Sequence, residues 1–134
     1  MELQKSEINE AYEFVTEDLG RNARFETFSK RIQPTYRRLI EAAQEDQKIT
    51  YGDLAKYADT NRRRYMSKLL DGIGYIEEGR GNPPTTVIVV HSGEETPADE
   101  FLELVDALGI RHRYESTTDE DLIAEITNEV FSHY

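Results

Sequence analysis

Apolar side chains along the first third of the chain follow the period of helices. Between residues 3 and 19 they recur every three or four positions, which is the spacing of an amphipathic helix rather than of a strand. Gly20 is expected to end this helix. The segment 25–43 has the same period, but Pro34 lies inside it, and a proline within a helix removes a hydrogen bond and crowds the preceding turn. We therefore expect a short piece and then a second helix from about Thr35.

The next segment has the order of a helix-turn-helix. Thr50 is placed to cap a short helix that ends at Ala58, because an acid three residues later nearly completes a capping box. Asp59 and Thr60 supply a turn. A second helix is expected over Asn61–Ile73, whose apolar residues form one stripe. Two helices joined by such a turn are typical of proteins that enter the major groove of DNA.

Glycine and proline mark a connection after this second helix. Four glycines and two prolines fall between residues 72 and 84, so a regular helix is not expected to continue through them. The segment 85–90 then contains an unbroken apolar run, which predicts a strand buried on both faces. We interpret residues 79–84 as a turn or as the wing of a winged helix.

The last third is predicted to contain two more helices. Thr96 and Pro97 are typical of a helix start, and Gly109 is typical of a helix end. Residues 110–115 are a second candidate strand. Thr118 is followed by three acids and is expected to cap the last helix.

Charge is distributed unevenly along the 134 residues. The net charge is −11, yet residues 21–80 carry thirteen basic and nine acidic side chains, whereas residues 1–20 and 81–134 carry −5 and −10. Ionic screening lets a local basic face act while distant carboxylates are largely hidden. A lysine-poor, acidic chain of this kind is also typical of a salt-adapted organism. The absence of cysteine excludes disulfides, thiolate metal sites and a cysteine nucleophile.

Three consecutive arginines, Arg62, Arg63 and Arg64, stand at the start of the helix predicted from Asn61. Backbone N–H groups and guanidinium groups at a helix N-terminus can both bind phosphate. Basic charge at this end opposes the helix dipole, and a bound phosphate would relieve that cost. Alternatively, the arginines only solvate the helix and pair with acids near in sequence, namely Asp53, Asp59 or Asp71.

A family resemblance rests on the run Thr50-Tyr51-Gly52-Asp53-Leu54-Ala55, on the arginine before the apolar stripe, and on a strand that ends in Val90-His91. These elements resemble the DNA-binding domain of alkylguanine-DNA alkyltransferases and of alkyltransferase-like proteins. The resemblance implies a winged helix in which Tyr51 presses on a phosphate and Arg64 fills the space left by a flipped nucleotide. Val90 stands at the place of the alkyl-accepting cysteine, and His91 at that of the activating histidine. Since valine offers no lone pair, the family's transfer reaction is not expected.

We therefore predict one α+β domain, mostly α, with a winged helix-turn-helix core at 47–95, N-terminal helices at 1–46 and C-terminal helices at 96–134. The predicted function is non-catalytic binding of double-stranded DNA in a regulatory or site-recognition role, without a cofactor. The N-terminal helices are long enough to pair two copies as a homodimer. The chain lacks an apolar run of about 18 residues and a signal-peptide pattern, so a cytoplasmic location is expected. The predicted DNA contacts are Tyr51, Asn61, Arg62, Arg63, Arg64, Lys68 and Arg80.

Two other interpretations stay open at this point. The first is a protein-interaction or structural module, virus-encoded in one version, whose arginines form salt bridges. The second makes the segments 86–90, 98–108 and 110–114 a strand, a helix and a parallel strand, with a ligand near His91 and Ser92 at the carboxyl end of the strand. Weaker candidates are a zinc site on the three histidines and a divalent-cation site on the acids 119–121.

Overall fold

The computed structural model describes residues 2–60 and 63–134, and for residues 63 and 64 it describes the backbone only. The α-helices are α1 (Lys5–Glu13), α2 (Phe25–Gln44), α3 (Tyr51–Tyr57), α4 (Arg63–Gly79), α5 (Glu100–Leu108) and α6 (Asp119–His133). A π-helical segment η1 (Phe14–Asp18) continues α1, and the 3-10 helices are η2 (Thr85–Ile88) and η3 (Arg111–Arg113). The strands are β1 (Ile49–Thr50) and β2 (Val89–Val90). The prediction of a mostly helical α+β fold is confirmed.

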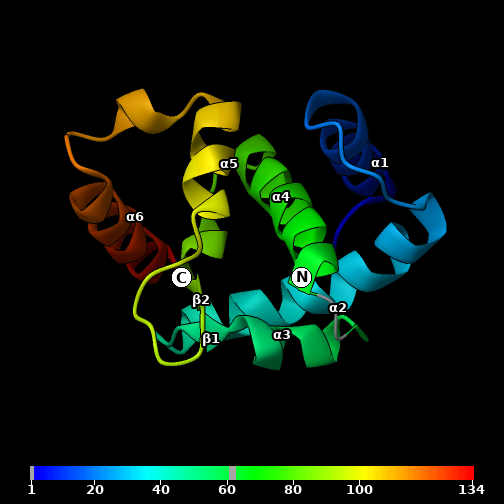
Figure 1. Ribbon diagram of the computed structural model, residues 1–134, viewed down its shortest axis with the longest axis horizontal. Helices are drawn as coiled ribbons and strands as arrows, with labels where there is room; N and C mark the ends of the chain where they lie inside the picture. The colour runs from blue at the N-terminus through cyan, green and yellow to red at the C-terminus, as the bar shows by residue number, and fades with distance from the viewer. Residues whose placement is uncertain (1, 61–62) are drawn as a thin grey trace.

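Helix α4 is the centre of the fold. In Figure 1 it rises from a layer formed by α2 and α3, with α1 on one side and α5 and α6 on the other. It contacts α1, α2, α3 and α5, and Met66, Leu69 and Ile73 on its inner face are fully buried. The buried side chains from α1 to α6 form one hydrophobic cluster, so all six α-helices are held against the same core.

Helix α2 runs without interruption through Pro34, and the prediction of a helix break there is wrong. Phe28 and Ile32 before the proline and Tyr36 and Leu39 after it are all fully buried. They lie on one continuous stripe, so packing against the core outweighs the hydrogen bond that the proline removes.

Helix α4 also extends to Gly79, beyond the end at Ile73 that the glycines predicted. These glycines allow close packing rather than a turn. A Cβ on Gly72 would lie 2.7 Å from Cζ of Phe28 in α2, and one on Gly74 would lie 2.5 Å from Cδ2 of Leu104 in α5. The helix therefore approaches both neighbours more closely than alanine would allow.

The sheet differs from the prediction in extent and in partner. Residues 85–88 form η2, and only Val89 and Val90 are extended. They pair in parallel with β1, with Thr50 opposite Val90. Within residues 2–60 and 63–134 this parallel pair is the only sheet, so the strand predicted at 110–115 is wrong, and with it the βαβ unit. The described part also lacks the antiparallel hairpin of a typical wing.

A buried carboxylate explains why the apolar segment turns instead of extending. Glu77 is fully buried in α4 and accepts hydrogen bonds from the Tyr36 hydroxyl (2.8 Å) and the Asn82 side-chain amide (3.2 Å). The hydroxyls of Thr85 and Tyr134 donate to the same carboxylate. Because an unpaired buried carboxylate is costly, these donors fix η2 against α4.

The structure confirms three of the predicted helix starts and ends and contradicts one. The hydroxyls of Thr50 and Thr118 accept from the backbone N–H groups of Asp53 (3.1 Å) and Asp121 (3.2 Å), as expected. Gly109 ends α5 in the left-handed conformation. The start predicted at Thr96 and Pro97 is wrong, because α5 begins at Glu100, after a buried Pro97 and Ala98.

Candidate nucleic-acid interface

The predicted helix-turn-helix is formed by α3 and α4, and α2 packs against both helices. Ala58 ends α3 and is fully buried, which ties the turn to the core. Asp59 follows with a φ of 54°, a left-handed conformation that aspartate tolerates better than most residues. The Thr60 N–H returns to the Ala55 carbonyl at 3.2 Å. The turn therefore has a defined path to the point where the arginine run begins.

The arginine run itself is only partly within the structure. Asn61 and Arg62 lie outside the described residues, as do the side chains of Arg63 and Arg64. The backbone places Arg63 as the first residue of α4. The predicted contacts thus belong to the N-terminal turn of the second helix and to the residues immediately before it.

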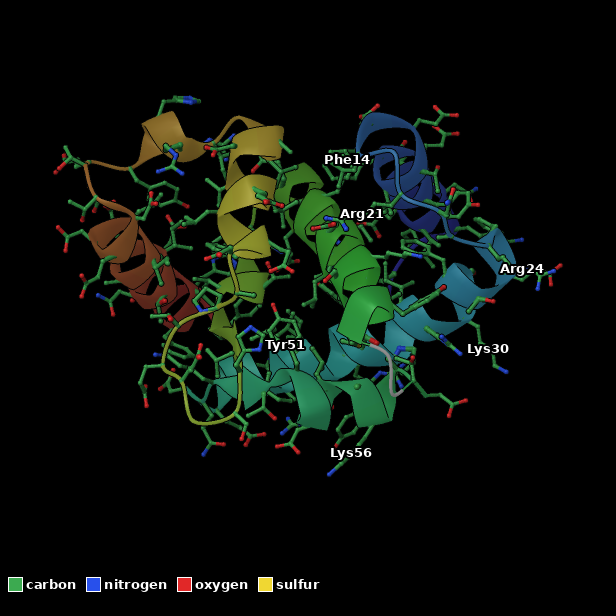
Figure 2. All side chains as sticks on the ribbon, in the orientation of Figure 1. Phe14, Arg21, Arg24, Lys30, Tyr51 and Lys56 are labelled. Carbon is green, nitrogen blue, oxygen red and sulfur yellow. The ribbon has the colours of Figure 1, made fainter. Side chains whose placement is uncertain are left out.

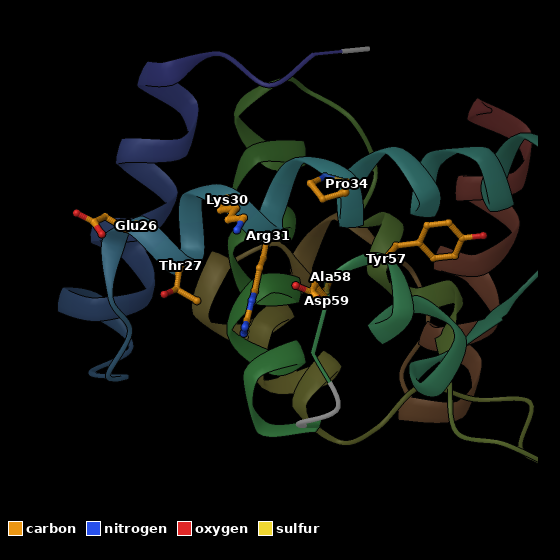
Figure 3. A pocket seen from close by; sticks show the side chains of 8 residues that line it. All are labelled: Glu26, Thr27, Lys30, Arg31, Pro34, Tyr57, Ala58 and Asp59. Atoms are coloured by element: carbon orange, nitrogen blue, oxygen red, sulfur yellow. The ribbon is translucent and has the colours of Figure 1, made fainter.

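Two basic residues that the sequence analysis did not select lie beside this turn. Lys30 and Arg31 of α2 share a pocket of about 360 Å³ with Tyr57, Ala58 and Asp59. Figure 3 shows Glu26 at one end of the pocket and Tyr57 at the other, with Lys30, Arg31 and Pro34 between them. Arg31 lies 4.7 Å from the centroid of the Tyr65 ring. The missed signal was the excess of basic residues over 21–80, which extends to this helix.

Some of the basic side chains near this pocket have a carboxylate partner and others have none. Among the described residues, Arg24, Lys30 and Arg31 form no ion pair with a carboxylate. Lys56 lies 3.4 Å from Asp53, with both side chains mostly exposed, a pairing that contributes little. In Figure 2, Arg24, Lys30 and Lys56 project along the border of the molecule nearest the start of α4.

Lys68 and Arg80 are already engaged within the protein. Lys68 donates to the Asn22 carbonyl and lies 5.4 Å from the Tyr65 ring centroid. Arg80 binds both oxygens of Glu7 at 2.6 and 2.8 Å, and also the Glu2 carbonyl at 2.9 Å. Hydrogen bonding to Glu7 raises the pKa of Arg80 further above its ordinary value. In this arrangement Arg80 joins α4 to α1, and we omit it from the interface.

Tyr51 lies at a separate place, where the two strands end. The register of β1 and β2 sets Tyr51 and His91 side by side, and their rings stack with centroids 4.8 Å apart and planes at 23°. Val90 is 5% exposed. Three positions that carried the family resemblance thus meet, although residues 51 and 90 are far apart in the chain.

Other candidate chemistry is limited in the part of the chain that the structure describes. No group of three or more histidine, aspartate and glutamate side chains there is placed to hold a metal ion. No helix there is long and apolar enough to cross a membrane. Comparisons with protein-family models, curated proteins and solved structures gave no match.

Proposed function

We propose that this protein binds double-stranded DNA through the N-terminal turn of α4, without catalysing a reaction, in a regulatory or site-recognition role. The proposal is carried by one observation: Lys30 and Arg31, which have no carboxylate partner among the described residues, lie next to the turn that leads into the arginine run. Cations from α2 and from the start of α4 would then face the same strand of phosphates.

The helix-turn-helix assigns different tasks to the arginines. Successive residues in a helix are separated by about 100°, so Arg62, Arg63 and Arg64 cannot all face one groove edge. We assign Arg64 to a base or to the space between bases, following its place in the family resemblance. Arg62 and Arg63, with Lys30 and Arg31, would hold phosphates.

The net charge of −11 does not exclude this partner. The Debye length is about 8 Å at physiological ionic strength, so distant carboxylates such as those of α6 are largely screened from a phosphate at the start of α4. Binding is expected to weaken steeply as salt rises, because each neutralised phosphate releases counterions. A homodimer, also proposed from the length of the N-terminal helices, would double the number of such contacts.

The test is fluorescence anisotropy with a labelled duplex at several salt concentrations. Arg64→Ala is expected to weaken binding by about 1–3 kcal/mol, and Arg62→Ala or Arg63→Ala to lower the salt slope by about one unit each. A Lys30→Gln/Arg31→Gln variant should lower that slope as the phosphate contacts do. Arg113→Gln is the control, because it also removes one positive charge but lies in η3, where Arg113 pairs with Glu78 near the C-terminal end of α4 at 2.5 Å.

Undiminished DNA affinity in the triple variant R62A/R63A/R64A would overturn the proposal. The rival function is a protein-interaction module, and one observation favours it: the Tyr57 side chain in the same pocket is 50% exposed. An apolar protein interface would respond little to salt. A steep salt slope therefore separates the two functions.

A further inference from the structure

A small cavity lies beside Tyr51 and shares no lining residue with the pocket of Lys30. It is bounded by Tyr51 at the start of α3, Ser67 and Asp71 of α4, Thr86 of η2 and the first residues of α5. It has room for one group of the size of a water molecule. The cavity is adjacent to the carboxyl ends of two parallel strands, where α/β folds commonly bind ligands.

Two buried side-chain oxygens from residues that line this cavity form no hydrogen bond with the described residues. Thr86 is 4% exposed, and its hydroxyl has no hydrogen-bond partner among the described residues. Asp71 is 3% exposed, and its Oδ2 likewise accepts no hydrogen bond there. Arg21 Nε lies 2.8 Å from that oxygen, but its N–H is not aligned with it. Buried acceptors without donors are costly, so both atoms favour a bound donor.

The cavity adjoins an acidic cleft of about 720 Å³. Glu94, Asp99, Glu100 and Glu103 line the cleft together with Arg21 and His91. Three links join the two spaces. Glu100 lines both of them, Arg21 is paired with Asp71, and His91 is stacked on Tyr51. Figure 2 shows Arg21 lying against α4. The combined site has a buried acceptor pair at its inner end and carboxylates along its outer part.

We propose that this site binds a linear polyamine, with one terminal ammonium group in the cavity and the remaining cationic groups along the cleft. A primary ammonium carries three donors and no acceptor, which matches an inner end that contains unsatisfied acceptors. Leu70, Phe101 and Leu104 line the same cavity with apolar side chains, which suit the methylene group next to the ammonium, while the rest of the alkyl chain would lie along the cleft. The outer carboxylates require further positive charges, which a polyamine supplies and a monoamine does not. This site does not depend on the proposed DNA interface.

The charge of the Asp71 carboxylate at the inner end makes the binding of an ammonium ligand depend on pH. Burial raises the pKa of Asp71, the Arg21 guanidinium lowers it, and the charges of Glu100 and Glu103 raise it, with a result of about 6. Tyr51 and His91 are the other titratable groups that face this end of the site. Below the pKa of Asp71 its charge is lost, so an ammonium ligand should bind more weakly at pH 5 than at pH 7.5.

The test is isothermal titration calorimetry of the full chain at low salt with spermidine, butylamine and 1,4-butanediol. Spermidine should bind more tightly than butylamine, and the uncharged diol should not bind. Thr86→Val keeps the shape of the side chain and removes the hydroxyl, and Asp71→Asn removes the charge. Each is expected to weaken spermidine binding about tenfold or more, the loss typical of one charged hydrogen bond. Asp106→Asn is the control, because Asp106 lies on α5 and pairs with Arg111.

Thr86→Val also separates loss of binding from loss of folding. The Thr86 hydroxyl has no hydrogen-bond partner among the described residues, so the melting temperature of the variant should not fall. Failure of spermidine to bind, or equal binding in the wild type and the Thr86→Val and Asp71→Asn variants, would overturn the proposal. Equal affinity for spermidine and butylamine would overturn the assignment to a polyamine. Duplex affinity of the same variants is measured separately, so failure here is distinct from failure of DNA binding.

Discussion

Asp71 carries an ionisable group at a position that water barely reaches. Its side chain is 5% exposed, and its nearest cation, Arg21, comes from the loop before α2. Burial shifts the pKa of this carboxyl from its ordinary 3.8 to about 6. Between these two pH values the folded protein holds a proton that the unfolded chain has released.

That difference predicts how stability depends on pH. Because the folded state binds more protons between about pH 4 and pH 6, the free energy of unfolding should fall as the pH rises through this window. The shift from 3.8 to about 6 corresponds to about 3 kcal/mol, as one pKa unit equals about 1.4 kcal/mol. Asp71→Asn should lose this decline, which urea unfolding at a series of pH values measures. Parallel curves for the wild type and the variant would contradict the prediction.

The sequence predicted the roles of residues whose partners are close in the chain, but not those of residues whose partners are distant. The Thr50 and Thr118 caps and the end at Gly109 were predicted because each depends on neighbours within a few residues. The contact of Asp71 with Arg21 joins positions far apart in the chain. Sequence spacing instead suggested Asp71 as a partner for the arginine run.

At the scale of helices, the predicted break at Pro34 and the predicted end of α4 at Ile73 were wrong because proline and glycine were taken to interrupt a helix wherever they occur. Pro34 and Gly74 both lie inside continuous helices, because the buried stripes on either side of them pack against the same core. The two-residue strands β1 and β2 were too short to show an alternating pattern. Propensity predicts an interruption, whereas the approach of another helix decides whether it occurs.

Glycine substitutions test this explanation. Gly74→Ala would place a Cβ 2.5 Å from Cδ2 of Leu104, and Leu104 is only 3% exposed, so the core must shift. We expect a loss of about 1–3 kcal/mol, typical of overpacking. Gly52→Ala in α3 is the matched control, since a Cβ there meets nothing within 4 Å and should stabilise the helix by about 0.5–1 kcal/mol. Thermal or urea unfolding of both variants checks the sign. Stabilisation by both would show that α4 tolerates a wider spacing.

At the scale of the whole molecule, the proposed interface is assembled from two separate segments. The sequence predicted the helix-turn-helix at 50–73, because caps, turn and apolar stripe agree there. It did not predict that Lys30 and Arg31 would lie beside that turn, because the break expected at Pro34 separated them from the rest of α2. It also assigned Arg80 to DNA, whereas folding brings Glu7 of α1 against it.

The separation of charge along the chain also predicts how salt acts on stability. Residues 81–134 carry a net charge of −10, and several of the ion pairs, such as that of Arg111 with Asp106, are substantially exposed. Exposed pairs contribute little, whereas excess charge of one sign repels itself in the compact state. Repulsion should therefore dominate, and screening should stabilise the fold.

Raising NaCl from about 0.01 M to about 0.1 M shortens the Debye length from about 30 Å to about 10 Å. The melting temperature should then rise by about 3–6 °C, the shift that about 1 kcal/mol produces in a chain of this size. A Glu13→Gln/Glu115→Gln variant removes two exposed carboxylates and should melt higher than the wild type at low salt, with a smaller response to NaCl. Calorimetry of both proteins at matched salt measures this. A melting temperature that falls with NaCl would mean that partly exposed ion pairs such as Glu7 with Arg80 outweigh the repulsion between the acidic helices.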